Sequence, residues 1–265
     1  MLPLALAVVL DLTTAAQASP RPRECRGAAG SDGVWVRLRG ADAQRYCELL
    51  ARGYARLGQT PQEALQAAQS AEALAGAVPA VRVLSARAEL RLGESQLAYL
   101  LFQQAEKADA QAFADPKALH DYARAASLAT QPLDAVRLYR LLVSRLALLD
   151  DLRERAFVQI EAAAHVLAHV EGGADEALGY LAQARREPLG LSPWLGALRL
   201  LAIQQSGRAQ ARGSLARPPS PASLGPPPPA GFSAEFPLLP PGLFAALQAT
   251  LAERTEVTSS KGKAP

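Results

Sequence analysis

The stretch RLGESQLAYLLFQQAEKA, from Arg91 to Ala108, decides the fold class. A Leu-Gly turn is followed by the small residue Ala98, by the aromatic Phe102 four positions later, and by Ala105 three positions after that. These three residues fall on one face of an α-helix, because residues three and four apart are neighbours on its surface. A small residue lets two helices approach closely, and a large one a turn later fills the gap to the next helix. The stretch therefore predicts a helix packed tightly against its neighbours.

The same order of residues recurs along the chain. Four segments begin with an alanine, have a second residue of the pattern four positions on, and have a third residue three positions after that. The leading alanines recur at intervals of about 34 to 42 residues, and helix pairs at such a period indicate a solenoid. The leading, second and third residues are Ala64, Ala98, Ala135 and Ala177, then Ala68, Phe102, Tyr139 and Leu181, then Ala71, Ala105, Leu142 and Ala184.

The composition supports an all-α chain. Of the 265 residues 49% are apolar but only 5% are aromatic, and alanine, leucine and arginine dominate, which favours helices over strands. Thr60, Pro61 and Glu63 predict an N-cap, a first helical residue and a capping box, and Asp115-Pro116 predicts another helix start. We expect short connections and antiparallel neighbours. The predicted helices are 42–57, 61–75, 79–92, 95–109, 116–129, 132–148, 151–170, 174–186 and 193–206.

This pattern resembles the tetratricopeptide repeat. The family's series of small, aromatic and turn residues appears over 50–71 and 84–105, as Leu50, Ala51, Tyr54, Gly58, Ala64 and Ala71, and as Ser85, Ala86, Gly93, Ala98, Phe102 and Ala105. The later units depart from it, since Thr130 stands at the turn glycine and Leu142 replaces a small residue. The resemblance implies an all-α, right-handed α-solenoid of antiparallel helix pairs over residues 42–206. A last helix led by Trp194 is expected to cap it.

The N-terminal residues resemble an export signal. Residues 1–18 are mostly apolar and end in Ala16-Gln17-Ala18, the small-x-small pattern that a signal peptidase cuts, although no Lys or Arg precedes the apolar part and Asp11 interrupts it. Cleavage after Ala18 would place the protein in the periplasm or outside the cell. If the start of the chain is misread, the protein is cytoplasmic.

The two cysteines bear on the compartment. Residues 19–41 are expected to be irregular, with a short strand-like piece at Val34, Val36 and Leu38, and they contain Cys25. Cys47 lies on the first predicted helix. In an oxidising compartment the two could form a disulfide. The alternative is that Cys47 is a core residue and Cys25 a free thiol.

The C-terminal part changes character. Residues 207–240 form a Pro-rich linker, residues 241–254 an amphipathic helix with Leu243, Phe244, Leu247 and Leu251 on one face, and residues 255–265 a disordered tail. Four roles are open for the helix. It could lie in the groove of the solenoid, dock on another protein, rest on a membrane surface, or cover the solenoid's exposed end.

No catalytic constellation stands out. Glu161, His165 and His169 share one helical face with the spacing of metal ligands, but they lack the His-Glu-x-x-His order, and His120 is the only other histidine. We therefore expect no metal, no cofactor and no enzymatic activity, and keep a metal-dependent enzyme using these three residues as an alternative. The net charge is only +3 with mixed signs, which argues against nucleic-acid binding, and no apolar run is long enough for a stable membrane span.

The functional expectation follows from the resemblance. In tetratricopeptide arrays the first helix of each pair lines a concave groove that receives a peptide. Such a basic groove suits an acidic segment or a C-terminal carboxylate, unless its arginines only solvate the array. We expect a non-enzymatic interaction scaffold of the cell envelope that captures a peptide or protein subunit, or alternatively a structural subunit of an envelope assembly. The candidate groove residues are Tyr46, Arg52, Arg56, Arg87, Arg91, Arg124, Val166 and His169.

Overall fold

The computed structural model describes Cys25, Leu38 and residues 40–184, 193–207, 238–240 and 242–261. All regular elements within these residues are helices, which confirms the all-α prediction for them. Two 3₁₀ turns, Ala110–Phe113 and Leu146–Leu148, interrupt the series. The α-helices are α2 (Ala41–Arg56), α3 (Pro61–Ala75), α4 (Pro79–Leu92), α5 (Ser95–Ala108), α6 (Pro116–Leu128), α7 (Pro132–Val143), α8 (Leu152–His169), α9 (Ala174–Ala184), α10 (Pro193–Gln205) and α11 (Leu243–Lys261).

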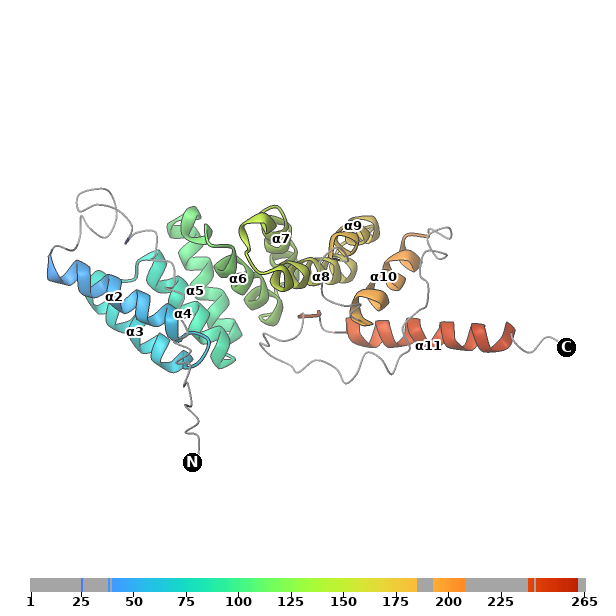
Figure 1. The fold of residues 1–265 in the computed structure, drawn as a ribbon, viewed down its shortest axis with the longest axis horizontal. Coiled ribbons are helices and arrows are strands. Elements are labelled where there is room, and N and C mark those ends of the chain that lie inside the picture. The colour runs from blue at the N-terminus through green and yellow to red at the C-terminus, as the bar shows by residue number, and fades with distance from the viewer. Residues whose placement is uncertain are drawn as a thin grey trace, which may run out of the picture.

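The helices follow one another along the long axis of the molecule (Figure 1). Helices α2 and α3 pack together, as do α4 and α5, α6 and α7, and α8 and α9. The second helix of each pair also contacts the first helix of the next pair. Helices adjacent in sequence are therefore adjacent in space, as the short connections predict.

The two helices of each pair occupy different sides of this row. On the side of α2, α4, α6 and α8, called here the first-helix side, α2 contacts α4, α4 contacts α6, and α8 contacts α10. On the second-helix side, long side chains connect the pairs. Arg137 of α7 lies 2.9 Å from Glu106 of α5, and Arg140 of α7 lies 2.7 Å from Glu176 of α9.

The core explains the order of small and large residues. Ala98, Phe102 and Ala105 are fully buried. The Phe102 ring stacks on Tyr122 of α6 with centroids 5.1 Å apart, so the large residue fills the space toward the next pair. Gly53 marks a close approach, because a Cβ added there would lie 2.5 Å from Leu84 Cδ2.

The helix starts agree only in part with the predicted caps. Asp115 Oδ1 accepts a hydrogen bond from the Lys117 amide, as an N-cap does. The capping box at Thr60 is wrong. The Thr60 side chain makes no capping bond and its hydroxyl is buried without a partner, while Glu63 instead forms an ion pair with Arg56 at 3.4 Å. Pro61 still starts α3, since its fixed φ suits the first helical position.

The predicted boundary of one helix changes, and the turn before that helix has an unusual backbone conformation. The helix predicted over 132–148 ends at Val143, and the 3₁₀ turn Leu146–Leu148 follows. Before that helix, Thr130 has φ 57°, so it adopts the left-handed conformation of the glycine it replaces. That conformation costs a β-branched residue on the order of 1–2 kcal/mol, which the surrounding helices must offset.

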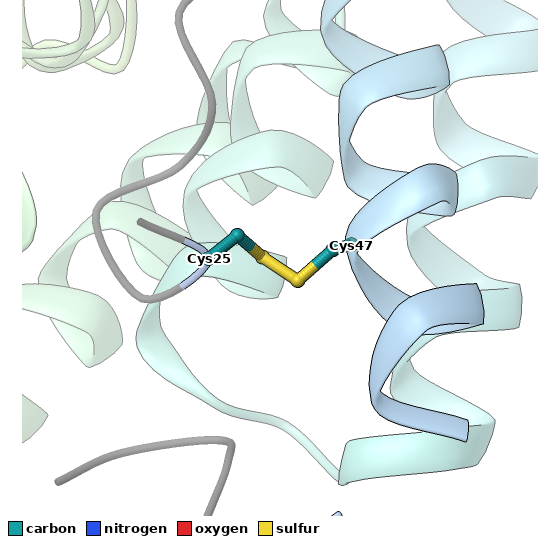
Figure 2. Close-up of a disulfide and its surroundings, with 2 residues drawn as sticks. All are labelled: Cys25 and Cys47. Carbon is teal, nitrogen blue, oxygen red and sulfur yellow. A yellow bond between two sulfur atoms is a disulfide. The ribbon is translucent and has the colours of Figure 1, made fainter. Parts of the chain in front are cut away.

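The disulfide joins Cys25 to Cys47 of α2 (Figure 2). Their Cα atoms lie 5.9 Å apart, within the ordinary range for such a bond. Cys25 is buried against the first helix pair rather than left as a free thiol. Closing this loop contributes about 3 kcal/mol of stability in the chain-entropy model.

The C-terminal helix differs from its prediction. Helix α11 runs to Lys261, beyond the predicted 241–254, and takes in most of the tail that was predicted to be disordered. The possible signal peptide at 1–18, the strand-like piece at Val34 and Val36, and the linker up to residue 237 lie outside the described residues. None of the described helices combines the length and hydropathy needed to cross a membrane.

Candidate functional site

The most concentrated polar chemistry surrounds Glu161 of α8. This side chain has no exposed surface, yet its carboxylate accepts several hydrogen bonds. Arg124 of α6 donates from Nη2 at 2.5 Å and from Nε at 3.1 Å. His120 Nε2 lies at 2.7 Å and the Tyr139 hydroxyl at 3.0 Å. The carboxylate therefore holds α6, α7 and α8 together.

The electrostatics keep this cluster ionised. Burial alone raises the pKa of a carboxyl, but Arg124 and His120 outweigh it and hold the pKa of Glu161 well below its usual range. Glu161 in turn outweighs the effect of burial on His120 and raises the pKa of that imidazole. Glu154 also faces His120, with Oε1 3.5 Å from Nδ1. The buried charge is thus compensated by opposite charges rather than neutralised.

A second buried cluster links α4 to α6. Asp121 Oδ2 lies 2.6 Å from Arg87 Nε and 3.1 Å from Arg91 Nη1. Burial opposes ionisation of Asp121, but the two guanidinium groups lower its pKa to about 2. Arg91 also donates to the Arg87 carbonyl at 3.0 Å. Both clusters join neighbouring first helices, and the Glu161 cluster also includes Tyr139 of the second helix α7.

The proposed metal ligands do not assemble. His165 Nδ1 lies 2.8 Å from the Glu161 carbonyl oxygen, which can only accept, so Nδ1 carries the proton and Nε2 accepts from the Ser127 hydroxyl at 2.7 Å. Burial lowers the pKa of His165 to about 4, consistent with this neutral form. Both ring nitrogens and the Glu161 carboxylate are therefore already engaged. No group of three or more His, Cys, Asp and Glu suited to a metal occurs among the described residues.

A distant segment of the chain reaches the same carboxylate. The backbone N–H of Leu238 donates to Glu161 Oε1 at 2.7 Å. The next two residues, Leu239 and Pro240, are buried. The segment leads into α11, which packs on α10 with Leu243, Leu247 and Leu251 buried in a cluster shared with α8, α9 and α10 (Figure 1). A segment without regular secondary structure therefore lies against the first helix α8.

The eight predicted groove residues differ in how far they are buried. Arg52 and Arg56 are exposed on α2, and Arg91 and His169 are partly buried. Tyr46 and Val166 are core residues, and Arg87 and Arg124 are buried in ion pairs, so these four are not surface contacts as predicted. The physical reason is that helical period identifies a face, but not whether that face meets solvent or the next helix.

The sequence interpretation missed Asp121, Glu154 and Leu238. An acid such as Asp121 among the apolar residues of a predicted helix is a usable signal, because a buried acid requires a cationic partner. Tyr139 was recognised only as a packing residue. Leu238 carried no signal, since it lies 77 residues from Glu161 and contributes its backbone.

No protein-family model matches this chain, and neither the curated proteins nor the solved structures include a significant match. The resemblance to the tetratricopeptide repeat therefore rests on the quoted residues.

Proposed function

We propose that this chain is a right-handed α-solenoid of the tetratricopeptide type. It acts as a non-enzymatic scaffold of the cell envelope and captures a peptide or protein subunit on its first-helix side. The contact of Leu238 with Glu161 carries this proposal. A first helix of this chain already holds a non-helical segment through a backbone N–H, and backbone hydrogen bonds are one way in which scaffolds hold peptides.

The helix arrangement supports a curved array. Among the first helices, α2 contacts α4, α4 contacts α6 and α8 contacts α10, whereas long arginine and glutamate side chains bridge α5 to α7 and α7 to α9. Closer spacing on one side bends a row of helices toward that side. The first helices then line the concave surface.

The exposed cations suggest the class of ligand. Arg52 and Arg56 lie on α2, and the Arg56 Nε is 3.4 Å from Glu63 Oε2 in a pair whose two side chains are about half exposed. Exposed arginines favour a ligand that carries carboxylates. The disulfide supports export, since such bonds persist in oxidising compartments.

A cross-linked capture from an envelope extract tests the proposal. The full chain is compared with an Arg52→Glu, Arg56→Glu variant, and with a control bearing Lys107→Glu, an exposed cation on the second helix α5. We expect the double variant to lose at least about tenfold of a partner that the control retains. Equal capture by all three chains would contradict a basic first-helix site.

A structural subunit of an envelope assembly is the second candidate. Exposed leucines on the second-helix side favour it: Leu97 and Leu100 on α5, and Leu133 on α7 with 76% of its surface exposed. If Leu133→Asp abolishes co-purification while Arg52→Glu, Arg56→Glu does not, the second-helix side is the assembly contact.

A further inference from the structure

Glu161 binds donors of two different origins. Arg124, His120 and Tyr139 belong to the neighbouring helices α6 and α7. Leu238 comes from beyond the row of pairs and offers only its backbone N–H. A hydrogen bond from a neutral donor is stronger when its acceptor is ionised. Any residue except proline can supply a backbone N–H donor. The site therefore accepts a backbone N–H largely independently of the side chain at that position.

The residues after Leu238 add an apolar stripe. Leu239 is buried, and Leu243, Leu247 and Leu251 follow at helical spacing on one buried face of α11. They lie in one cluster with residues of α8 and α10, among them Ile160 and Leu198. The opposite face of α11 is exposed at Ala245, Gln248 and Ala249. The helix is thus held on one side only, as an amphipathic ligand is held by a groove.

This segment reaches its place as a tethered element. Residues 208–237, which are rich in proline, separate it in sequence from α10. A covalent connection gives a docked segment an effective concentration on the order of 1 mM. The row of pairs from α2 to α9 makes its own contacts between consecutive helices.

We propose that residues 238–251 are an internal ligand of the Glu161 site. A partner protein competes with them by presenting the same chemistry, a non-helical leucine- and proline-containing segment that continues into a helix with leucines four residues apart. This inference rests on the proposed scaffold function and adds a contact at Glu161 of α8, separate from the exposed arginines of α2. To displace this segment, a partner must bind the site more favourably than the tethered segment does.

The first test uses a fluorescent synthetic peptide of residues 236–261 as the probe. Binding is measured by anisotropy to the full chain, to full-length Leu247→Asp, and to full-length Gln248→Asp, which adds the same charge to the exposed face of α11. A tether at about 1 mM and a peptide dissociation constant of about 0.1 mM predict roughly tenfold tighter binding to Leu247→Asp than to the unmodified chain. Gln248→Asp should behave like the unmodified chain.

Two peptide variants test the bond to Glu161. Leu238→Pro removes the N–H donor, whereas Leu238→Ala removes the side chain and keeps that donor. We expect Leu238→Pro to weaken binding to Leu247→Asp by about tenfold or more and Leu238→Ala to weaken it much less. Equal losses would overturn backbone recognition by Glu161.

Hydrogen exchange on the unmodified chain tests the proposal independently if the Leu247→Asp variant does not fold. An internal ligand predicts that α11 amides exchange well before those of α8, because the segment undocks locally. Exchange of both helices only through global unfolding would show that α11 is an inseparable part of the core, and would overturn the proposal. Failure of folded Leu247→Asp to bind the peptide would also overturn it.

The outcomes separate this inference from the scaffold function. If the extract yields a partner that the peptide fails to displace, competition at Glu161 is wrong and the scaffold function stands. If the peptide binds as expected and the extract yields no partner, the internal docking stands and the scaffold function loses its support.

Discussion

Two glutamates with similar partners lie in different surroundings, Glu161 on the first helix α8 and Glu176 on the second helix α9. Glu161 binds Arg124 and Tyr139 on the first-helix side, and Glu176 of α9 binds Arg140 and Tyr180 on the second-helix side. Their burial differs sharply. The side chains of Glu161 and Arg124 are 0% and 6% exposed, and those of Glu176 and Arg140 are 30% and 47% exposed. The same pairing of chemical groups therefore occurs once in a buried site and once in a solvent-exposed site.

The difference shows what each pair contributes. Water can replace the partner of an exposed charge, so the outer pair stabilises the fold only weakly. No water replaces the partner of Glu161, and a displaced helix would leave a charge buried alone. The inner cluster thus restricts which faces of α6 and α8 can meet, whereas the outer pair has little influence on that choice.

The largest expected effect comes from Glu161→Gln. Neutralising this side chain leaves Arg124 buried without its counter-charge, which costs about 3–5 kcal/mol. The matched control Glu176→Gln should cost less than about 1 kcal/mol. Urea unfolding followed by circular dichroism measures both. Similar losses for the two variants would show that burial does not distinguish them.

Removing one hydroxyl from each cluster gives a smaller effect. Tyr139→Phe deletes a buried bond to an ionised acceptor and should lower the unfolding free energy by about 1.5–3 kcal/mol. Tyr180→Phe deletes the bond to Glu176, where water can substitute, and should cost under about 1 kcal/mol. The same unfolding measurement applies. A larger loss for Tyr180→Phe would reverse the comparison.

The inner cluster should also impose a pH dependence. His165 has a folded pKa of about 4, below the unfolded value of 6.5. Its stabilising contribution is complete above pH 6.5 and is lost as the pH falls toward 4, because only the unfolded chain binds the proton in that window. We expect the unfolding free energy to fall by about 1 kcal/mol between pH 6 and pH 5.

His165→Gln is the control for this window. The variant should lose most of the slope between pH 6 and pH 5, although the partly exposed His169, whose pKa burial also lowers, retains some of it. His120 has the opposite dependence on pH. Its pKa is raised, so its contribution is complete below pH 6.5 and is lost as the pH rises through the folded pKa. An unchanged slope in His165→Gln would contradict the assignment.

The smallest effect is expected for the outer ion pair itself. A double-mutant cycle with Arg140→Ala and Glu176→Ala should give a coupling of about 0.2–1 kcal/mol. Screening should reduce it further in 1 M salt, where the Debye length is about 3 Å. A coupling that is large and independent of salt would mean that the outer pair behaves like the buried one.

The sequence predicted packing better than polar contacts. Ala98, Phe102 and Ala105 have a spacing that directly reflects helix crossing, and all three are buried as that spacing requires. Arg124 was predicted to line a groove but is buried, and the period does not reveal that Glu161 of the next pair reaches it. The partners of buried charges are set by tertiary contacts, which the helical period does not show. The Leu238 N–H that binds Glu161 lies 77 residues away along the chain.

Helix α11 has a consequence for association between copies of the chain. A row of helices has two ends, and an uncovered apolar end is a surface on which another copy can add repeatedly to form a filament. Leu243, Leu247 and Leu251 cover one such end by packing on α10. Covering this apolar surface within the chain removes it as a contact for a second copy.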